Sequence, residues 1–301
     1  MRVLIPIDGS AQSARAFELI ARRAPRMNPK PVVELVNVQH PAPMAALAKF
    51  GHEDVQAAFV EEGRRVLSTV TDAVAASGLD VAGAVRVGAP GPTLAHEAED
   101  FRADMIVMGA RGLSPVQRFL LGSVSRGVLE HARMPVLLTR GRLLPDRENL
   151  RVVLAVDGST HGLRAAEFIA SHPDFFGPSP EIHVICVLPD YERGTRTGPK
   201  DFEPVLEKMR GRYEEEESAL WHESVDAMLA LLKSRGLAAQ GVRLSGRADE
   251  MIAAYAKDHG DLIVMGTHGW GRLRSAVLGS TAAKTGARTE LPLLLVRIQG
   301  D

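Results

Sequence analysis

The chain has 301 residues, of which 45% are hydrophobic and 24% charged, and its formal net charge is −1. This length allows two domains with real cores, and the near-zero charge gives no global basic field that would point to nucleic acid. One cysteine, Cys186, excludes an internal disulfide, and no apolar run approaches the ~20 residues of a membrane helix. We expect a cytoplasmic protein without a signal peptide, because a strand-like run follows Met1 directly.

The first half alternates strand and helix patterns. Apolar runs predict strands over residues 2–7, 32–38, 83–87, 104–108 and 136–139. Helical patterns lie between them at 10–24, 54–77, 92–100 and 123–133, with Ser10 as the expected cap of the first helix. The strands are apolar throughout, which indicates burial on both faces. Such strands separated by helices predict a doubly wound parallel α/β sheet.

The second half repeats this order. Strands are expected near 151–156, 181–187, 241–245, 261–265 and 293–297, and helices near 159–171, 202–235, 248–259 and 280–289. Residues 3–10 match residues 152–159, which lie 149 positions further on, whereas a glycine motif recurs after 157 positions. The difference, 8 residues (157 against 149), is placed in a surface loop at 191–200. We predict a domain duplication with domains at 1–142 and 149–301 and a polar linker over 140–149.

The glycine motif has the form G-x2-G-x9-G-S and follows an apolar strand in each half. Its members are Gly109, Gly112, Gly122 and Ser123 in the first half and Gly266, Gly269, Gly279 and Ser280 in the second. Glycine lets the backbone approach a phosphate closely. The first turn of a helix presents unpaired N–H groups and positive potential. The motif therefore predicts two nucleotide-sized anion sites, or one site and its relic.

Other candidate residues follow the first and second strands, where ligands of such sheets bind. Asp8 and Asp157 follow the first strand of each half, and Val38 and Val187 end the second strand. A pocket here would hold an adenosine between strands one, two and four, with its phosphates on the Gly-Ser helix starts. Each residue type also has a plainer role, because aspartate caps helices and glycine makes tight turns.

Together these motifs resemble the universal stress protein family, as a tandem of two domains. The resemblance is carried by residues 6–10, 109–114, 121–124 and 131–137 in the first half and by 156–159, 266–269, 278–280 and 292–296 in the second. It implies the adenine-nucleotide α-hydrolase-like (Rossmann-like) fold, with a five-stranded parallel sheet of order 3-2-1-4-5 in each domain. It also implies the ATP-binding branch of the family, and hence ATP or ADP with Mg²⁺ as the cofactor.

The resemblance assigns site residues to both halves. They are Asp8, Val38, Met108, Gly109, Gly112, Gly122, Ser123 and Val124 in the first, and Asp157, Val187, Met265, Gly266, Gly269, Gly279, Ser280 and Thr281 in the second. The aspartate and a second-strand backbone group would contact the adenosine, and the glycine motif the ribose and phosphates. The second half has Ala155 where the first has Pro6, and its closing helix contains Gly286. These departures predict a looser second site.

The apolar fifth strands are expected at sheet edges, which need a cover. The resemblance implies that they pair the two domains about a pseudo-twofold axis, and it leaves further homodimerisation open. The expected function is that of a stress-response or signalling regulator, in which the nucleotide shifts a conformation or an assembly that an unidentified protein partner recognises.

The sequence favours a binding protein over an enzyme. It has no G-x4-G-K-[ST] loop, no G-x-S-x-G elbow and no H-E-x-x-H pair. Weak ATP hydrolysis stays open. One alternative is an interaction scaffold that does not depend on nucleotide. Another is an adenine-nucleotide-dependent transferase or ligase of the related fold, which is disfavoured because residues 8–10 read Asp-Gly-Ser where those enzymes carry other signatures.

Overall fold

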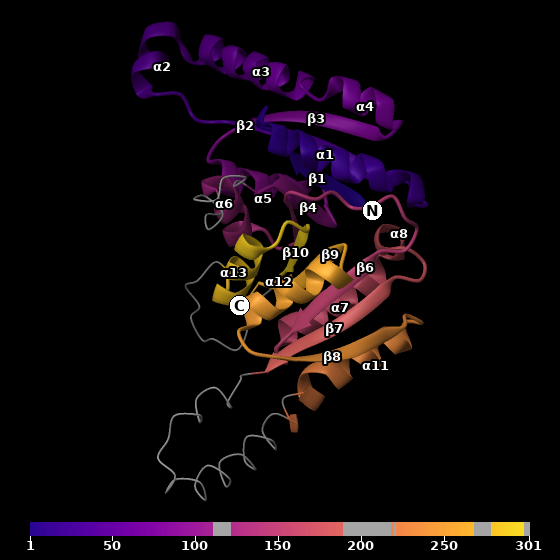
Figure 1. The fold of residues 1–301 in the computed structure, drawn as a ribbon. Coiled ribbons are helices and arrows are strands. Elements are labelled where there is room, and N and C mark those ends of the chain that lie inside the picture. The colour runs from indigo at the N-terminus through magenta and orange to yellow at the C-terminus, as the bar shows by residue number, and fades with distance from the viewer. Residues whose placement is uncertain (111–121, 189–217, 220, 268–277, 298–301) are drawn as a thin grey trace, which may run out of the picture.

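The computed structural model describes residues 1–110, 122–188, 218–219, 221–267 and 278–297. The two halves form one ten-stranded sheet in the order β3-β2-β1-β4-β5-β10-β9-β6-β7-β8 (Figure 1). The strands are β1 (Arg2–Pro6), β2 (Val32–Gln39), β3 (Asp80–Val87), β4 (Met105–Gly109), β5 (Val136–Thr139), β6 (Arg151–Val156), β7 (Glu181–Leu188), β8 (Ala239–Ser245), β9 (Leu262–Gly266) and β10 (Leu293–Val296). Within each half the strands are parallel and follow the order 3-2-1-4-5, which confirms the predicted fold class.

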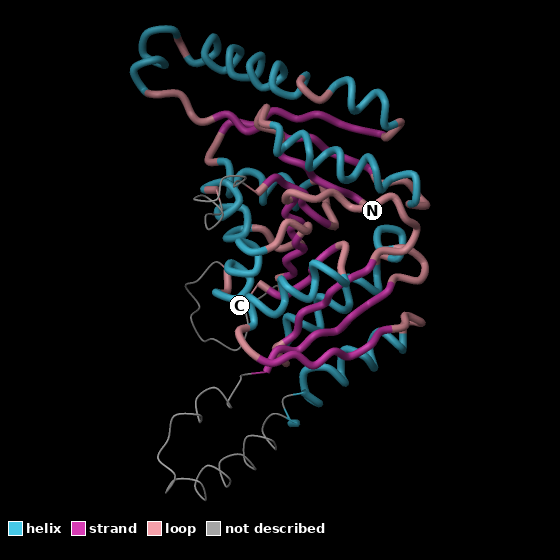
Figure 2. Tube along the Cα trace, in the orientation of Figure 1, coloured by secondary structure: helices cyan, strands magenta, loops and turns pink. Residues whose placement is uncertain are grey.

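Helices cover both faces of this sheet, as the tube in Figure 2 lets the reader follow. In the first half they are α1 (Ala11–Arg23), the 3₁₀ turn η1 (Ala24–Arg26), α2 (Met44–Phe50), α3 (His52–Ser68), α4 (Thr71–Ser77), α5 (Pro90–Asp100) and α6 (Ser123–His131). In the second they are α7 (Thr160–Ser171), α8 (Pro173–Phe176), the π-helical η3 (His222–Asp226), α11 (Ala227–Ser234), α12 (Ala248–His259) and α13 (Ser280–Arg288). No described helix has the length and apolar character that a membrane crossing would need.

Two hydrophobic cores lie on the two faces, and each runs through both halves. One joins α1 and α7 to alternate strand residues such as Val3 and Val152. The other joins α5, α6, α12 and α13 to the residues between them, such as Leu4 and Val153. The alternation follows from the opposite directions of successive side chains in a strand. The halves therefore share their hydrophobic interior.

The junction of the halves is the pairing of β5 with β10. The two strands are antiparallel, with Leu137 opposite Leu294 and Val136 opposite Leu295. All residues of both strands are buried. The expected pairing of the fifth strands is thus confirmed, and it covers two edges that would otherwise expose apolar backbone.

One long predicted helix is wrong in part. Residues 54–77 form two helices, α3 and α4, separated at Thr69 and Val70. The hydroxyls of Ser68 and Thr69 donate to the carbonyls of Arg65 and Val66, at 2.8 and 2.7 Å, and such local bonds compete with helix continuation. Val70 then leaves helical geometry and buries its side chain to 3% exposure. The helix α2 was also not predicted, and most of the predicted helix 202–235 and the loop 191–200 lie outside the described residues.

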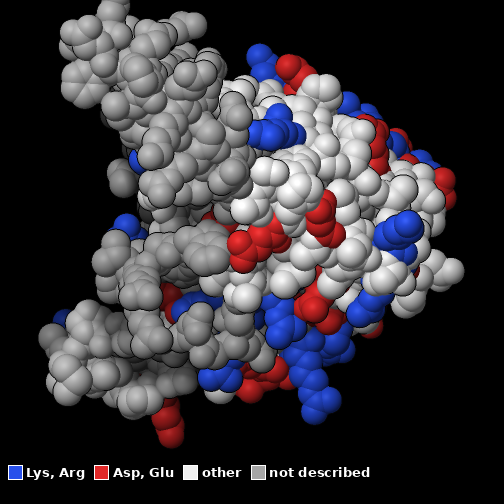
Figure 3. Space-filling model, turned by 90° about the horizontal axis from the view of Figure 1, so that it is seen from below, with Lys and Arg blue, Asp and Glu red and all other residues white. Residues whose placement is uncertain are grey.

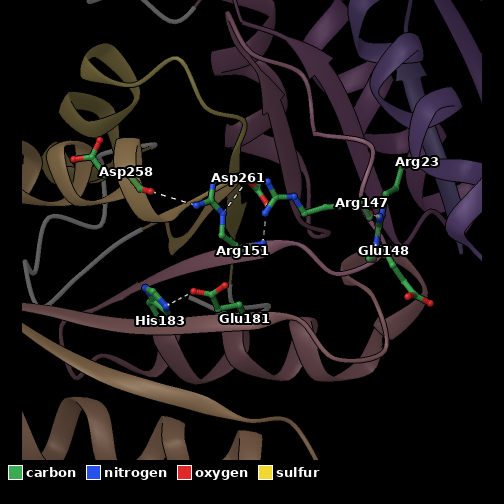
Figure 4. A network of polar contacts seen from close by, with 8 residues as sticks. All are labelled: Arg23, Arg147, Glu148, Arg151, Glu181, His183, Asp258 and Asp261. Carbon is green, nitrogen blue, oxygen red and sulfur yellow. Dashed lines mark hydrogen bonds and ion pairs between the residues drawn. The ribbon is translucent and has the colours of Figure 1, made fainter.

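The expected polar linker is held against both halves. Leu144 is buried in a core. Arg23, at the end of α1 and 2% exposed, donates to three carbonyls beyond its own half, those of Phe175, Arg147 and Glu148, at 2.6, 2.5 and 2.6 Å. Figure 4 shows this side chain pointing at the connecting segment, where Arg147 in turn meets Asp261 at 3.5 Å. The connection is therefore a packed strap between the halves.

Candidate functional site

The carboxyl ends of β1, β2 and β4 bring several predicted residues to one edge of the sheet. Pro6 pairs with Val36, and the N–H of Ile7 donates to the carbonyl of Val36 at 2.9 Å. Continuing this register by two residues brings Asp8 level with Val38. The pairing of Leu4 with Ile106 likewise brings Pro6 level with Met108. Parallel strands thus gather residues that are about 30 and 100 positions apart in the sequence.

The turn after β1 fixes the Asp8 carboxylate. Gly9 has a φ of +78°, a conformation that glycine adopts without steric cost. The Asp8 side chain accepts from the N–H of Ser10 at 3.0 Å, and its own N–H donates to the hydroxyl of Ser13 at 3.3 Å. Ser10, not Asp8, caps α1, accepting from the N–H of Ser13 at 3.2 Å. The aspartate therefore orders the turn while its side chain stays exposed.

Two opposing effects act on the pKa of Asp8. Partial burial raises the pKa, but hydrogen bonds from the Ser10 and Ser13 hydroxyls and from backbone N–H groups outweigh it. The net result is a pKa below the usual value for aspartate. The group is therefore an anion at neutral pH, and it can accept hydrogen bonds from sugar hydroxyls or from an amino group.

The second half repeats the geometry. Val156 pairs with Cys186, so Asp157 comes level with Val187, and Ala155 pairs with Met265. Gly158 has a φ of +80°, and the Asp157 side chain accepts from the N–H of Ser159 at 3.1 Å.

The start of the closing helix lies beside the glycine turn in each half. The N–H of Gly279 donates to the carbonyl of Thr267 at 2.6 Å, and in the first half the hydroxyl of Ser125 lies 3.5 Å from the carbonyl of Gly109. Gly122 and Gly279 are the N-caps of α6 and α13, and neither cap is a side-chain hydrogen bond. First-turn N–H groups without a side-chain acceptor, at the positive end of a helix, suit an anion.

At least one glycine of the motif is required by packing and does not need a ligand to explain it. A Cβ on Gly109 would lie 2.7 Å from the Cβ of Gln12 and 2.8 Å from its carbonyl carbon, so packing against α1 already demands glycine there. The other predicted residues near the turns, Val124 and Thr281, lie in the first turns of α6 and α13, with Ser123 and Ser280 exposed ahead of them. Gly112 and Gly269 lie outside the described residues.

One polar residue under the first site was missed by the sequence reading. Asn37, 4% exposed in β2, donates from Nδ2 to the carbonyl of Ile7 at 2.8 Å and accepts from Gln39 at 2.7 Å. Its signal was a polar residue between the valines at 36 and 38 of β2. The second half has Cys186 at the equivalent position, and burial raises the pKa of this thiol. The first candidate site therefore has a buried amide bonded to the carbonyl that follows β1, and the second has a thiol at that position.

The described side chains of each candidate site would hold a metal ion only together with oxygen atoms from a bound molecule. No group of three or more His, Cys, Asp or Glu residues within the described ranges could hold a metal ion. Mg²⁺ commonly takes one or two carboxylates, several waters and substrate phosphates. One aspartate in each half fits that mode. The phosphates of a bound nucleotide, together with water, would supply the other oxygen ligands.

A cavity of about 490 Å³ lies between the two halves and adjoins the first glycine turn, because its lining includes Ala110, which follows Gly109, and Gln12, which packs against Gly109. None of the predicted nucleotide-site residues lines it.

Comparisons with known proteins agree with this architecture. The sequence model described as the universal stress protein family matches residues 1–140 and 148–297. A universal stress protein of Mycolicibacterium smegmatis is 26% identical over 312 residues, covering 98% of this chain and 96% of the relative. The crystal structure of a universal stress protein from Archaeoglobus fulgidus has the same fold, with a TM-score of 0.67 at 22% identity, and the match covers 99% of this chain and 96% of that one.

A third similar protein is shorter. It is a universal stress protein whose crystal structure is described as a complex with cAMP, and it is 28% identical to this chain. The match covers 46% of this chain and 94% of that protein, with a TM-score of 0.33.

Proposed function

Because this chain belongs to the universal stress protein family and carries two copies of the family's domain, we propose that each half binds an adenine nucleotide. The observation that carries the proposal is the repeated edge of the sheet. In both halves an exposed aspartate, ordered by a tight turn, lies at the end of the strand next to a glycine turn and a helix start without a side-chain cap. The domain bounds 1–142 and 149–301 belong to the same proposal, and the ranges matched by the family support them.

The geometry suggests a division of roles. Asp8 and Asp157, as acceptors, would take hydrogen bonds from the nucleoside, with the backbone of Val38 and Val187 beside it. The first-turn N–H groups of α6 and α13 would take the phosphates, because the helix dipole favours negative charge there. Mg²⁺, if it accompanies the nucleotide, would neutralise phosphate charge. The carboxylates offer no second group for activating water, so hydrolysis is expected to be weak at most.

We infer a regulatory role from the continuity of the fold. The glycine turns follow β4 and β9, which flank the pair β5–β10 at the centre of the sheet. A nucleotide that binds one conformation more tightly will shift the population toward it, and the shared cores give such a shift a route across both halves. A protein partner would then recognise that conformation or a further assembly. The cytoplasmic location stays part of the proposal and rests on the single, buried cysteine.

The test begins with the purified protein as it is. The chain is denatured, and any released nucleotide is identified and counted by chromatography and mass spectrometry. The same is done for Gly122→Ala and Gly279→Ala, each of which adds a methyl group at one helix start only, so that each variant is the control for the other site. ATP, ADP and cAMP are then titrated separately to identify the preferred ligand.

Two nucleotides per chain, reduced by half in each variant, is the expected result. One nucleotide, lost only in Gly122→Ala, would identify the second site as a relic. No released nucleotide, and no binding of added Mg-ATP, ADP or cAMP, would reject the proposal in favour of a nucleotide-independent scaffold.

A further inference from the structure

The cavity between the halves has a lining that the proposed nucleotide sites do not use. Its walls come from α1, from the end of β4 and the segment after β5 in the first half, and from α12, α13 and the loop into β10 in the second. Its charged side chains are Arg15, Arg140, Arg142, Lys257 and Arg288 against Glu250 and Glu290. Five basic groups and two acidic groups leave a net charge of +3 on the lining.

Among the residues that the structure describes, one of these five cations has a carboxylate partner. Arg288 is paired, at 2.6 Å with Asp249 and at 3.0 Å with Glu250. Within the described residues, Arg15, Arg140, Arg142 and Lys257 take part in no ion pair. On the part of the surface that Figure 3 shows, by contrast, basic and acidic side chains lie near one another. The cavity therefore concentrates uncompensated positive charge between the halves.

Arg140 is the most constrained of these groups. It is half-buried, and burial lowers its pKa. Its one hydrogen bond runs from Nε to the carbonyl of Thr289 at 3.4 Å, which is long for a charged donor. Both terminal nitrogens of the guanidinium are left without a protein acceptor in the described part of the chain. A partly desolvated charge of this kind is costly unless something pairs with it.

The duplication supplies an internal comparison for Arg140. Its counterpart at the end of the other fifth strand, 157 positions on, is Arg297. Arg297 donates from Nη1 to the carbonyls of Leu129 and Glu130, at 2.9 and 2.7 Å, at the end of α6. Arg297 thus donates from one nitrogen to two carbonyls of the opposite half, whereas Arg140 makes one longer bond and lines the cavity.

Arg15 shows the same contrast. It donates to the carbonyl of Gly141 at 3.1 Å and has no carboxylate partner. Its counterpart 149 positions on is Arg164, which pairs with Glu167 at 3.0 Å. Two positions of the first half, Arg15 and Arg140, therefore each have one carbonyl acceptor and no carboxylate partner among the described residues, and both line the cavity.

We propose that this cavity is a binding site for a small polyanion of the polyphosphate class, held between the two halves. Its volume lies within the range of small-molecule sites, about 300–1,000 Å³. Planar guanidinium groups bind phosphate oxygens in pairs, and the lysine adds a point charge. Because the walls belong to both halves, the ligand would stabilise one arrangement of them. The cavity shares none of the proposed nucleotide-site residues, although its lining residue Ala110 directly follows Gly109, and the inference goes beyond the function proposed for those sites.

Pyrophosphate is the probe for the test. Citrate, a polyanion that carries carboxylates in place of phosphates, is the second probe, and comparing the two affinities distinguishes a phosphate ligand from a carboxylate ligand. Both are titrated by calorimetry into the full chain in the Gly122→Ala, Gly279→Ala background, so that the helix starts do not contribute. Arg140→Gln and Lys257→Gln change the cavity. Arg297→Gln is the matched control, because it removes the same charge at the equivalent position outside the cavity.

We expect one pyrophosphate per chain, bound about 10- to 100-fold more weakly by Arg140→Gln, as for the loss of one charge-assisted contact. Lys257→Gln, a change at an exposed residue, should weaken binding several-fold without affecting folding, and Arg297→Gln should bind as the background does. Unfolding midpoints check that the variants are folded. Tighter binding of citrate than of pyrophosphate would overturn the phosphate assignment.

Three results would overturn the site itself. They are no binding of either anion, equal affinity in Arg140→Gln and the background, or equal weakening by Arg297→Gln and Arg140→Gln. The nucleotide proposal is tested separately by the glycine variants alone. A loss of nucleotide binding leaves the cavity result standing, and the reverse holds as well.

Discussion

Arg23 offers the sharpest test of how the two halves are held together. Its guanidinium is buried at the end of α1 and donates to the carbonyls of Phe175, Arg147 and Glu148. Burial and the nearby charge of Arg26 lower its pKa, while Asp146 and Glu148 oppose this effect. Arginine remains charged at neutral pH despite such shifts. We therefore treat the contact as one buried cation that satisfies three carbonyl groups.

The substitution Arg23→Met keeps much of the apolar stem and removes all three bonds. A hydrogen bond to a charged group contributes about 1.5–3 kcal/mol, but the three share one side chain and offset its desolvation, so they do not add. The variant leaves three carbonyl groups without this donor, at about 1–3 kcal/mol for each that water does not reach, and we expect a net loss of about 3 kcal/mol. Arg23→Lys should lie between the variant and the wild type, because lysine keeps the charge without the planar fork.

The assay is guanidinium chloride unfolding at pH 7, followed by far-ultraviolet circular dichroism. Arg22→Met is the matched control, because the neighbouring arginine is 60% exposed and makes only a surface ion pair with Glu18, worth about 0.3–0.5 kcal/mol. Since the contact joins the halves, Arg23→Met should also broaden or split the transition. A loss below about 1 kcal/mol, or one equal to that of Arg22→Met, would refute the reasoning.

Three further predictions concern packing, the central strands and pH. Gly91→Ala puts a Cβ 2.6 Å from the backbone of α6 and should lower the free energy of chemical unfolding by about 1–3 kcal/mol. The control is Gly83→Ala, whose Cβ meets a flexible side chain at 3.4 Å and should change stability by less than about 0.5 kcal/mol. Leu294→Lys buries a charge in the β5–β10 pair and should lower the unfolding midpoint and expand the chain in small-angle scattering; unchanged values would count against the shared core. Burial raises the pKa of Asp249, but its hydrogen bond with Arg288 and the charges of Arg247 and Arg288 outweigh this effect, so the net pKa is lowered. The carboxylate therefore stabilises the fold above about pH 4, and this stabilisation is lost as the pH falls through the lowered pKa. Asp249→Asn should therefore cost about 1–3 kcal/mol at pH 7 and flatten the acid limb of the stability curve, and an unchanged limb would argue against the contact.

Much of the candidate site followed from local sequence. A strand that is apolar throughout, followed by Asp-Gly-Ser, places an aspartate at the carboxyl edge of a parallel sheet, because parallel strands end at one edge. Gly9 and Gly158 adopt the positive φ that such a turn requires. Ser10 caps α1 as predicted, and α6 and α13 begin at the predicted residues, Ser123 and Ser280. Asn37 was not predicted as a site residue, because its hydrogen bond to the carbonyl of Ile7 depends on the register of two strands.

The sequence by itself determined the order of the elements, the duplication and the edge of the sheet at which a ligand would bind, because these depend on local periodicity, on turn residues and on self-similarity. The break between α3 and α4 lay beyond it, since the burial of Val70 depends on what α3 packs against. The tertiary structure alone decided the packed linker, the buried Arg23 and the cavity at which Arg140 makes one long hydrogen bond, to Thr289, while Arg297 donates to two carbonyls. These features arise from contacts between residues more than 100 positions apart. Local sequence patterns do not indicate which distant groups a charged side chain will contact.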